Sequence, residues 1–264
     1  MNVHAVYGPS LPEAGWVPAP SYLLRRRRIL AWLKDLPPGR YLEVGCGPGA
    51  LVYELRARGF DCKALETSPE ALEMARQLPG NIEISRQEES DWVGTFDYLA
   101  AFEVLEHIEN DRGTLDQWKR WLRPGGRLLI SVPAHQRKWN ASDVWAGHYR
   151  RYEREQLRAL LVAAGFEIHR FESYGFPLAN LIEPIRARYH ARQLTGQPTA
   201  DGDSVGAKHE RSRQSGVSRS LETRLYPLQE SVIGVLAMRA AFALQRLFIG
   251  TDLGTGYLVL AKLR

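Results

Sequence analysis

Short apolar runs alternate with segments of helical periodicity from about residue 40 to about residue 175. The short runs are rich in Val, Ile, Leu, Tyr and Phe, which is typical of strands buried in a sheet. In chain order they are RYLEVGC, CKALET, NIEIS, FDYLAAFE, RLLISVP and EIHRFESY, and GYLVLAKLR adds a seventh at the end of the chain. Strands that alternate with helices in this way predict a mainly parallel sheet with helices on both faces.

The segments between these runs carry the signals that begin and end helices. ALVYELRARGF ends at Gly59 and EREQLRALLVAAGF ends at Gly165, and glycine is the usual residue just past a helix end. SPEALEMARQL has Thr67 or Ser68 as its N-terminal cap and Pro69 in its first turn. We therefore expect an α/β fold with a doubly wound sheet.

The pattern divides the chain into four segments: an N-terminal lead and helix (1–37), a core (38–175), a helical insertion (176–253) and a final strand (254–264). The N-terminal helix, SYLLRRRRILAWLKDL, carries four arginines, which we expect on a solvated face; contact with an anion is the alternative. The stretch near 195–220 has almost no apolar residues, so we expect it to be flexible. An apolar helix or helix pair follows, with a break expected near Pro227.

Composition narrows the class of protein. The chain has 264 residues, a formal charge of +5 and a pI of about 9.3, which suit an anionic ligand but are too weak to imply nucleic acid. Cys46 and Cys62 give neither a disulfide framework nor a metal-ligand spacing. We recognise no secretion signal and no uninterrupted apolar run long enough to cross a bilayer. We therefore expect a cytoplasmic protein.

Three glycines at alternate positions follow the first strand of the core. Gly45, Gly47 and Gly49 form G-x-G-x-G, whereas the dinucleotide-binding spacing G-x-G-x-x-G would need a glycine at Ala50. A strand, a glycine-rich turn and a helix together place backbone N–H groups at one edge of the sheet, where a ligand can approach closely. Glu66 ends the second strand about twenty residues further on, where α/β sheets bind ribose hydroxyls. Taken alone, the glycines fit a purely structural turn as well.

These motifs, in this order, resemble those of the class I S-adenosylmethionine (SAM) dependent methyltransferases, of domain types 11 and 23. The resemblance covers about 38–175 and the final strand. It implies a seven-stranded Rossmann-like sheet whose last strand is antiparallel between strands five and six, with a helical cap inserted between strands six and seven. It also implies that the methionine part of SAM passes the glycine loop, where a Cβ at Gly45 or Gly47 would collide with it.

Three motifs resemble the SAM-binding segments of the family. LEVGCGPG resembles the first motif, Glu66 resembles the acid that binds ribose, and QEES resembles the segment beside adenine. The SAM-binding residues that we infer are Glu43, Gly45, Cys46, Gly47, Gly49, Glu66, Thr67, Glu88, Glu89, Phe102 and Glu103.

The segment after the fourth strand carries two acids and a histidine. Glu103, Glu106 and His107 have helical spacing, so they can share a helix face. EVLEH is similar to a block in ubiquinone-biosynthesis O-methyltransferases, which implies these three residues as candidate ligands of a divalent metal. The same block occurs in family members without a known metal, and we expect none here. His107 is a candidate general base, although it can instead hold the loop in place.

The connection after the fifth strand, AHQRKWNASDVWAGHYRRYEREQL, is long and aromatic, which is typical of a lid or a substrate wall. It contains GHYRRY, which is similar to a motif in a bacterial subgroup of these methyltransferases. His148 or Tyr149 could orient or deprotonate an acceptor hydroxyl. Equally, the two residues could attach the loop to the domain.

The insertion at 176–253 combines apolar helices with many arginines. Such an insertion suits the binding of an amphiphilic or anionic small-molecule acceptor, or peripheral contact with a membrane. It could also form the interface of a homodimer, so the protein is either a monomer or a homodimer. We therefore expect a SAM-dependent methyltransferase that acts by in-line displacement on a small or lipid-like acceptor, at oxygen. The alternatives are methylation of RNA or protein, methylation at N, S or C of a small metabolite, and a non-catalytic protein of this fold. We expect no nucleic-acid partner, and the glycine spacing argues against a nucleotide-dependent oxidoreductase.

Overall fold

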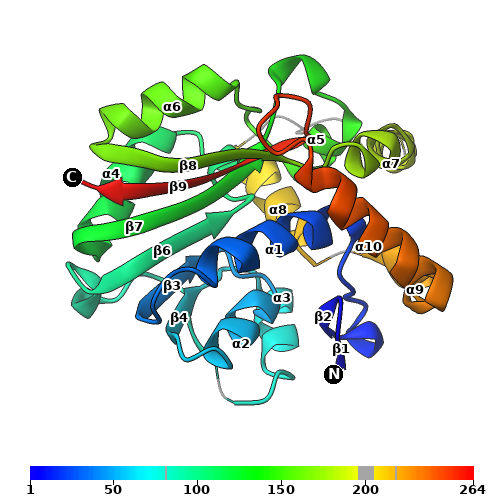
Figure 1. The fold of residues 1–264 in the computed structure, drawn as a ribbon, viewed down its shortest axis with the longest axis horizontal. Helices are drawn as coiled ribbons and strands as arrows, with labels where there is room; N and C mark the ends of the chain where they lie inside the picture. The colour runs from blue at the N-terminus through cyan, green and yellow to red at the C-terminus, as the bar shows by residue number, and fades with distance from the viewer. Residues whose placement is uncertain (81, 196–204, 218) are drawn as a thin grey trace.

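The computed structural model describes residues 1–264 except 81, 196–204 and 218 (Figure 1). A seven-stranded sheet with the order β5-β4-β3-β6-β7-β9-β8 forms its centre. β9 pairs antiparallel with both β7 and β8, while the pairs from β5 to β7 are parallel. The seven-stranded sheet and the position of its last strand are therefore confirmed. The strands are β3 (Arg40–Val44), β4 (Asp61–Leu65), β5 (Glu83–Ser85), β6 (Phe96–Phe102), β7 (Leu122–Pro133), β8 (Phe166–Tyr174) and β9 (Gly256–Leu263).

Helices cover the sheet on both faces, each over its own apolar core. α1 (Pro20–Leu33) and α2 (Ala50–Arg56) pack on one face, where Trp32 and Leu55 are fully buried. α4 (Asp111–Trp121) and α6 (Arg154–Ala163) pack on the other face around Trp118 and Leu161. α3 (Pro69–Ala75) begins at Ser68, whose side chain accepts a hydrogen bond from Ala71 N. This arrangement is the doubly wound fold that the sequence pattern predicts.

The positions of the four arginine side chains of α1 contradict the prediction that they form a solvated face. Arg26 forms a buried ion pair with Glu54 at 2.6 Å, and Arg28 forms another with Glu172 at 2.7 Å. Arg25 points toward the carboxyl ends of the strands, and Arg27 is the one of the four that is exposed. The prediction was wrong because the acidic partners lie on α2 and β8, far away in the sequence.

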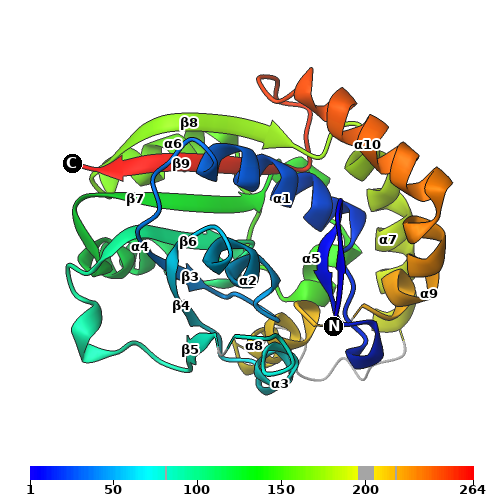
Figure 2. The same ribbon diagram turned by 60° about the horizontal axis from the view of Figure 1, so that its bottom comes forward.

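The described part of the insertion forms α7 (Leu178–Leu194), α8 (Val205–Ser215), α9 (Ser220–Glu230) and α10 (Val232–Arg246). α7, α9 and α10 lie together at one end of the molecule, whereas α8 lies apart from them, near α3 in the second view (Figures 1 and 2). Pro227 lies within α9, so the expected break near it falls instead at Ser231. Ser231 is extended and caps α10 through Gly234 N, and the two helices meet at a bend of 97°. α8 occupies part of the stretch that we expected to be flexible, and 196–204 of that stretch lie outside the described residues.

The N-terminal segment packs between the core and the helices α9 and α10 of the insertion, which with α7 we call the cap helices. It forms a small hairpin, β1 (Asn2–His4) and β2 (Gly8–Ser10). The buried ring of Tyr7 packs with Met238 and Phe242 of α10, and the Tyr7 hydroxyl donates a hydrogen bond to Gln229 O at 2.8 Å. No helix among the described residues is both long and apolar enough to cross a membrane by itself, although α9 and α10 together pass the same test as a bent pair.

Candidate functional site

A cavity of about 500 Å³ lies at the carboxyl ends of the central strands, beneath the cap helices. The glycine loop after β3 and Glu103 after β6 form part of its wall, and α1, α7, α9 and the connection between β7 and α6 form most of the rest. The direction of strand order reverses between β3 and β6, and open α/β sheets bind their ligands outside such a point. The position and size of this cavity therefore suit a small-molecule site.

The glycine loop has a different constraint at each position. Gly45 and Gly47 have φ of +68° and +56°, a region that favours glycine. A Cβ at Gly45 would lie 2.6 Å from Val104 Cγ2, so the chain itself, before any ligand, excludes a side chain there. A Cβ at Gly47 would meet no atom within 4 Å. Because Gly47 lines the cavity, its bare backbone leaves open space for a ligand.

Glu66 lies directly after β4 and binds the main chain around it. Its Oε2 accepts a hydrogen bond from Gly47 N at 2.8 Å. Its Oε1 accepts from Thr67 N at 2.7 Å and from Ser68 N at 2.8 Å. The carboxylate therefore fixes the glycine loop to the end of β4. The predictions that Glu66 binds the ribose hydroxyls and that Thr67 belongs to the SAM site stay predictions.

Glu88 and Glu89 follow β5, and both carboxylates are held by other side chains. Glu89 forms an ion pair with Lys63 at 3.1 Å and accepts a hydrogen bond from Trp92 Nε1 at 3.0 Å. Glu88 accepts one from Gln117 Nε2 at 2.7 Å. These contacts fix the course of the segment that we expect beside adenine.

Two further acids, Glu43 and Glu103, line the cavity close to the glycine loop. Glu43 is buried and accepts a hydrogen bond from Tyr41 Oη at 3.0 Å, and its burial raises the pKa to about 8. The Glu103 carboxylate accepts hydrogen bonds from Ser131 Oγ at 2.8 Å and Tyr174 Oη at 2.7 Å. Arg25 of α1 lies 3.5 Å from it. Phe102 and Cys46 complete this part of the wall.

The expected helix face shared by Glu103, Glu106 and His107 is not formed. Glu103 has φ of +58°, and only Leu105–His107 form a short 3-10 helix. The Glu103 side chain therefore turns toward Tyr174, away from the other two. The prediction of a shared face was wrong because it assumed a regular helix that begins directly after β6.

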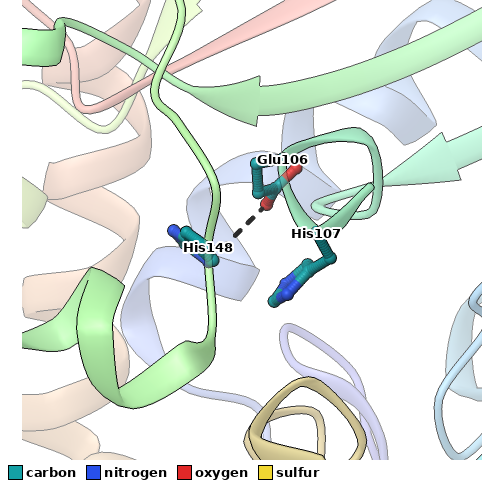
Figure 3. A group of neighbouring side chains, drawn as sticks. All are labelled: Glu106, His107 and His148. Atoms are coloured by element: carbon teal, nitrogen blue, oxygen red, sulfur yellow. Dashed lines mark ion pairs between the residues drawn. The ribbon is translucent and has the colours of Figure 1, made fainter. Parts of the chain in front are cut away.

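His148 takes the place beside Glu106 and His107 that we expected for Glu103 (Figure 3). Glu106 is fully buried, neither carboxylate oxygen has a hydrogen-bond partner among the described residues, and burial raises its pKa well above the ordinary value. His148 Nε2 lies 3.9 Å from Glu106 Oε1. The His107 ring meets that of His148 edge-on at 4.6 Å, and burial, with a smaller effect of His148, lowers the pKa of His107.

This cluster could hold a divalent cation, since one donor atom from each of Glu106, His107 and His148 lies within 4.8 Å of the others. One carboxylate and two imidazoles are ligands that transition metals accept. The donor set therefore differs from the one implied by the sequence, because Glu103 is replaced by His148. Bound there, a cation would supply a positive charge for an acceptor oxygen.

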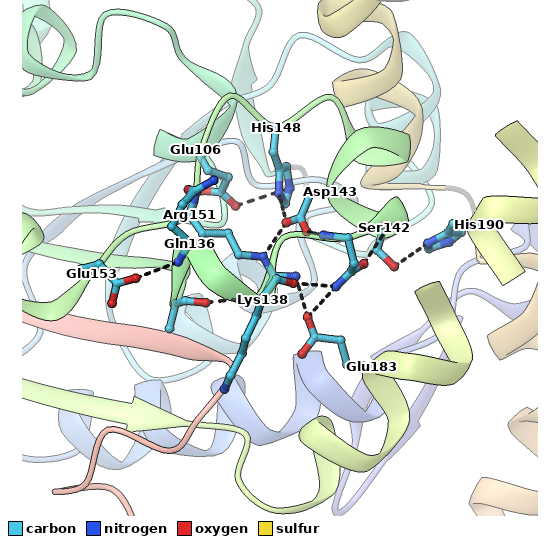
Figure 4. A network of polar contacts seen from close by, with 12 residues as sticks. Glu106, Gln136, Lys138, Ser142, Asp143, His148, Arg151, Glu153, Glu183 and His190 are labelled. Atoms are coloured by element: carbon cyan, nitrogen blue, oxygen red, sulfur yellow. Dashed lines mark hydrogen bonds and ion pairs between the residues drawn. The ribbon is translucent and has the colours of Figure 1, made fainter. Parts of the chain in front are cut away.

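A polar network links His148 to the cap (Figure 4). His148 Nδ1 lies 2.9 Å from Asp143 Oδ1, and Arg151 Nε donates to the same oxygen at 2.8 Å. Arg151 also binds Glu183 of α7. Asp143 is the third residue of α5 (Ala141–Ala146) and forms a capping box with Asn140, the N-cap residue, which fixes its position.

The network selects one tautomer of the histidine. Burial alone would raise the pKa of Asp143, but the hydrogen bonds from His148 and Arg151 outweigh burial and lower it. The carboxylate can only accept, so the Nδ1–H of His148 donates a hydrogen bond to Asp143. In this tautomer Nε2 is the acceptor nitrogen, on a residue that lines the cavity.

Tyr149 lies next to His148 but does not line the cavity. Its backbone N–H donates to Glu106 O at 2.8 Å, and Lys208 of α8 lies over its ring at 4.4 Å. These contacts fix the GHYRRY loop between Glu106 and α8. Of the two candidate residues in this motif, His148 is the one that faces the cavity.

Sequence analysis predicted that the loop containing Trp145 is a lid or a substrate wall, but it missed the residues that join Trp145. Trp145 and His190 stack with parallel rings at 4.2 Å, and both line the cavity together with Tyr22 and Arg219. Arg219 is placed over the Trp16 ring at 5.8 Å. The one sequence signal for this wall was the aromatic content of the loop that contains Trp145.

Comparison with known proteins assigns the chain to a family. A profile of the methyltransferase domain family matches residues 19–170, more than half of the chain. The chain therefore belongs to the methyltransferase domain family.

The relatives share only part of the chain. The ubiquinone biosynthesis O-methyltransferase of Xanthomonas oryzae pv. oryzae is 30% identical over 106 residues, which cover 37% of this chain and 44% of that enzyme. The mitochondrial enzyme of the same name from Schizosaccharomyces pombe is 34% identical over 102 residues, covering 35% and 37%. This chain thus spans less than half the length of those curated relatives. A solved SAM-dependent methyltransferase from Mesorhizobium loti shares the fold, with a TM-score of 0.54 at 16% identity over 92% of this chain and 98% of that one.

Proposed function

We propose that this methyltransferase transfers the methyl group of SAM to a hydroxyl oxygen of a small or lipid-like acceptor, with His148 as the general base. The observation that carries the proposal is the 2.9 Å contact between Asp143 and His148 in the wall of the cavity that also contains Gly47. A hydroxyl is a weak nucleophile until it loses its proton, so a positioned base is useful for O-methylation. The name of the ubiquinone biosynthesis relatives also favours an oxygen acceptor.

Bound SAM supplies a methyl group on a positively charged sulfur, which is a good leaving group. The acceptor oxygen forms a bond to the methyl carbon as the carbon–sulfur bond breaks, and the sulfur keeps the electron pair. The acceptor proton moves to Nε2 of His148. Asp143 then stabilises the resulting imidazolium through Nδ1, as an acid does in other acid–histidine pairs.

The protein contributes alignment and exclusion of water as well as the base. The glycine loop and the stacked rings of Trp145 and His190 both line the cavity. A mixed wall of aromatic, apolar and charged groups suits an acceptor with a ring or an apolar tail and one polar group. Holding donor and acceptor in one closed space supplies much of the rate enhancement of such transfers.

Transfer of a tritiated methyl group from SAM into organic extracts and into model phenols tests the proposal. We expect His148→Gln to lose about 100-fold or more in kcat with unchanged affinity for SAM, and His107→Gln to lose much less. Equal loss in both variants, with inhibition by a chelator, would indicate a metal in place of the base. Full activity of His148→Gln would indicate an acceptor atom that needs no deprotonation, such as an amine or a thiolate.

A further inference from the structure

Large apolar side chains are exposed together on the outer surface of α9 and α10. The most exposed of them are Val232 and Ile233, at 76% and 79%, and Leu247, at 75%. We call this surface the cap face; it comprises Leu225, Leu228, Val232, Ile233, Leu236, Leu244 and Leu247. Single exposed apolar residues are ordinary, but a contiguous set marks a binding surface.

α10 has the pattern of a helix that lies on an interface. At 100° per residue its exposed positions fill one side, and these are Val, Ile, Leu and Ala apart from Arg239 and Arg246. Both arginines fall at one border of that side, and Val232–Arg246 contains no acid. Met238 and Phe242 on the opposite side pack against the N-terminal segment, so only the outer side is free to bind.

The cavity of the candidate site reaches the same surface. Ile185 of α7 and Leu225 of α9 both line the cavity, and both are more than half exposed, at 61% and 53%. Arg186 and Glu222 lie between the same two helices at 3.9 Å. An acceptor could therefore pass between α7 and α9 with its apolar tail along Ile185 and Leu225 and a polar group beside Arg186 and Glu222.

We propose that the cap face docks on the surface of an anionic lipid bilayer and that an amphiphilic acceptor enters the cavity from that bilayer between α7 and α9. The second half of this proposal rests on the proposed function. α10, with 15 residues, is about 22 Å long, shorter than the roughly 30 Å hydrocarbon core, and the bend of 97° prevents a straight span with α9. The helices therefore lie on the bilayer, with the apolar side inserted.

Charge favours a lipid surface over a second copy of this chain. Arg239 and Arg246 at the border of the cap face attract negative charge. α10 offers none to a symmetry-related α10, and the acid nearest to it in sequence, Glu230, is the last residue of α9. Lipid phosphates and carboxylates supply that charge at the depth where the border of an inserted helix lies.

Sedimentation of the full-length chain with phosphatidylcholine vesicles, with and without phosphatidylserine, tests docking independently of catalysis. We expect binding that increases strongly with phosphatidylserine. The double variant Ile233→Glu with Leu236→Glu should lose at least ten-fold in bound fraction. Val93→Glu alters an equally exposed apolar residue outside the cap and should bind as the wild type does. Arg239→Glu with Arg246→Glu should lose the preference for phosphatidylserine.

A wild-type chain that binds SAM but no vesicle would overturn the docking proposal. So would a concentration-dependent dimer that the Ile233→Glu and Leu236→Glu variant abolishes, because the cap face would then bind a second copy. If vesicles bind normally but no lipid-like acceptor is methylated, the proposed function fails while docking stands.

Discussion

Asp143 Oδ1 accepts a hydrogen bond from His148 Nδ1 across 2.9 Å, and both residues lie in the connection between β7 and α6, Asp143 within α5. The same carboxylate oxygen binds Arg151, which reaches Glu183 of the cap helix α7. The residue that we propose as base is therefore oriented by a group that is itself fixed to the cap. Movement of α7 on acceptor binding would be transmitted directly to His148.

Asp143→Asn should lower kcat about 100-fold or more, because the amide no longer requires Nδ1 to carry the proton and stabilises the imidazolium less. We expect SAM affinity to change little, since Asp143 does not touch the glycine loop. Asp116→Asn, an exposed acid on α4, serves as the control and should behave as the wild type does. A pH–rate profile separates a lost base partner from a merely misfolded loop, because only the former shifts the acidic limb. An unshifted profile at full activity would contradict the assignment.

Gly47→Ala should weaken SAM binding about ten-fold or more, because its Cβ enters the open space beside the loop. Gly94→Ala is a matched control, since Gly94 also has a positive φ, +66°, and also has no atom within 4 Å of an added Cβ. Both substitutions should lower Tm by a similar few degrees through backbone strain. Calorimetric titration with SAM that gave equal affinity for both variants would exclude the loop as the methionine site.

Glu66→Ala should weaken SAM binding by about 1–3 kcal/mol through lost hydrogen bonds to a charged group. The structure adds a second cause, because Glu66 also holds Gly47 N and the main chain of Thr67. Glu66→Gln keeps one acceptor for the loop but no charge, so an intermediate affinity separates the two contributions. Unchanged affinity in Glu66→Ala would refute the ribose assignment.

Glu43 should make stability depend on pH when no ligand is bound. Burial raises its folded-state pKa to about 8, from an ordinary 4.5. The unfolded chain therefore releases this proton first, and the contribution of Glu43 is full below about pH 4.5 and lost as pH rises to about 8. The difference in unfolding free energy between wild type and Glu43→Gln should fall by up to about 1.4 kcal/mol per pH unit across that window. Denaturant titrations at several pH values measure it, and a constant difference would contradict a buried neutral Glu43.

The sheet could be predicted because each buried strand is a short apolar run bounded by helix signals, as RYLEVGC and its glycines illustrate. The antiparallel position of β9 came from family resemblance, since nothing in GYLVLAKLR states its neighbours. The predictions of a solvated arginine face on α1 and of a break near Pro227 differ from the structure for physical reasons. Glu54 and Glu172 are distant in sequence from their arginine partners. Pro227 is accommodated within α9, and the break falls at Ser231, whose backbone is extended and whose side chain caps α10.

The site was harder to predict than the sheet, because it is assembled from loops. A positive φ at Glu103 breaks the helical spacing on which the grouping with Glu106 depended. The length and aromatic content of its loop allowed His148 to be predicted as a candidate site residue from the sequence. Its relation to Glu106 and to α7 depends on contacts between segments far apart along the chain, which no local pattern records.

A crystal structure of this chain with S-adenosylhomocysteine and an acceptor analogue tests the central claim most directly. We predict that the amino-acid end of the product lies against Gly47, that its ribose hydroxyls meet Glu66, and that its sulfur faces the cavity lined by His148. A product bound elsewhere, or a sulfur turned away from His148 with the acceptor outside the cavity, would contradict the proposed methyl transfer at this site.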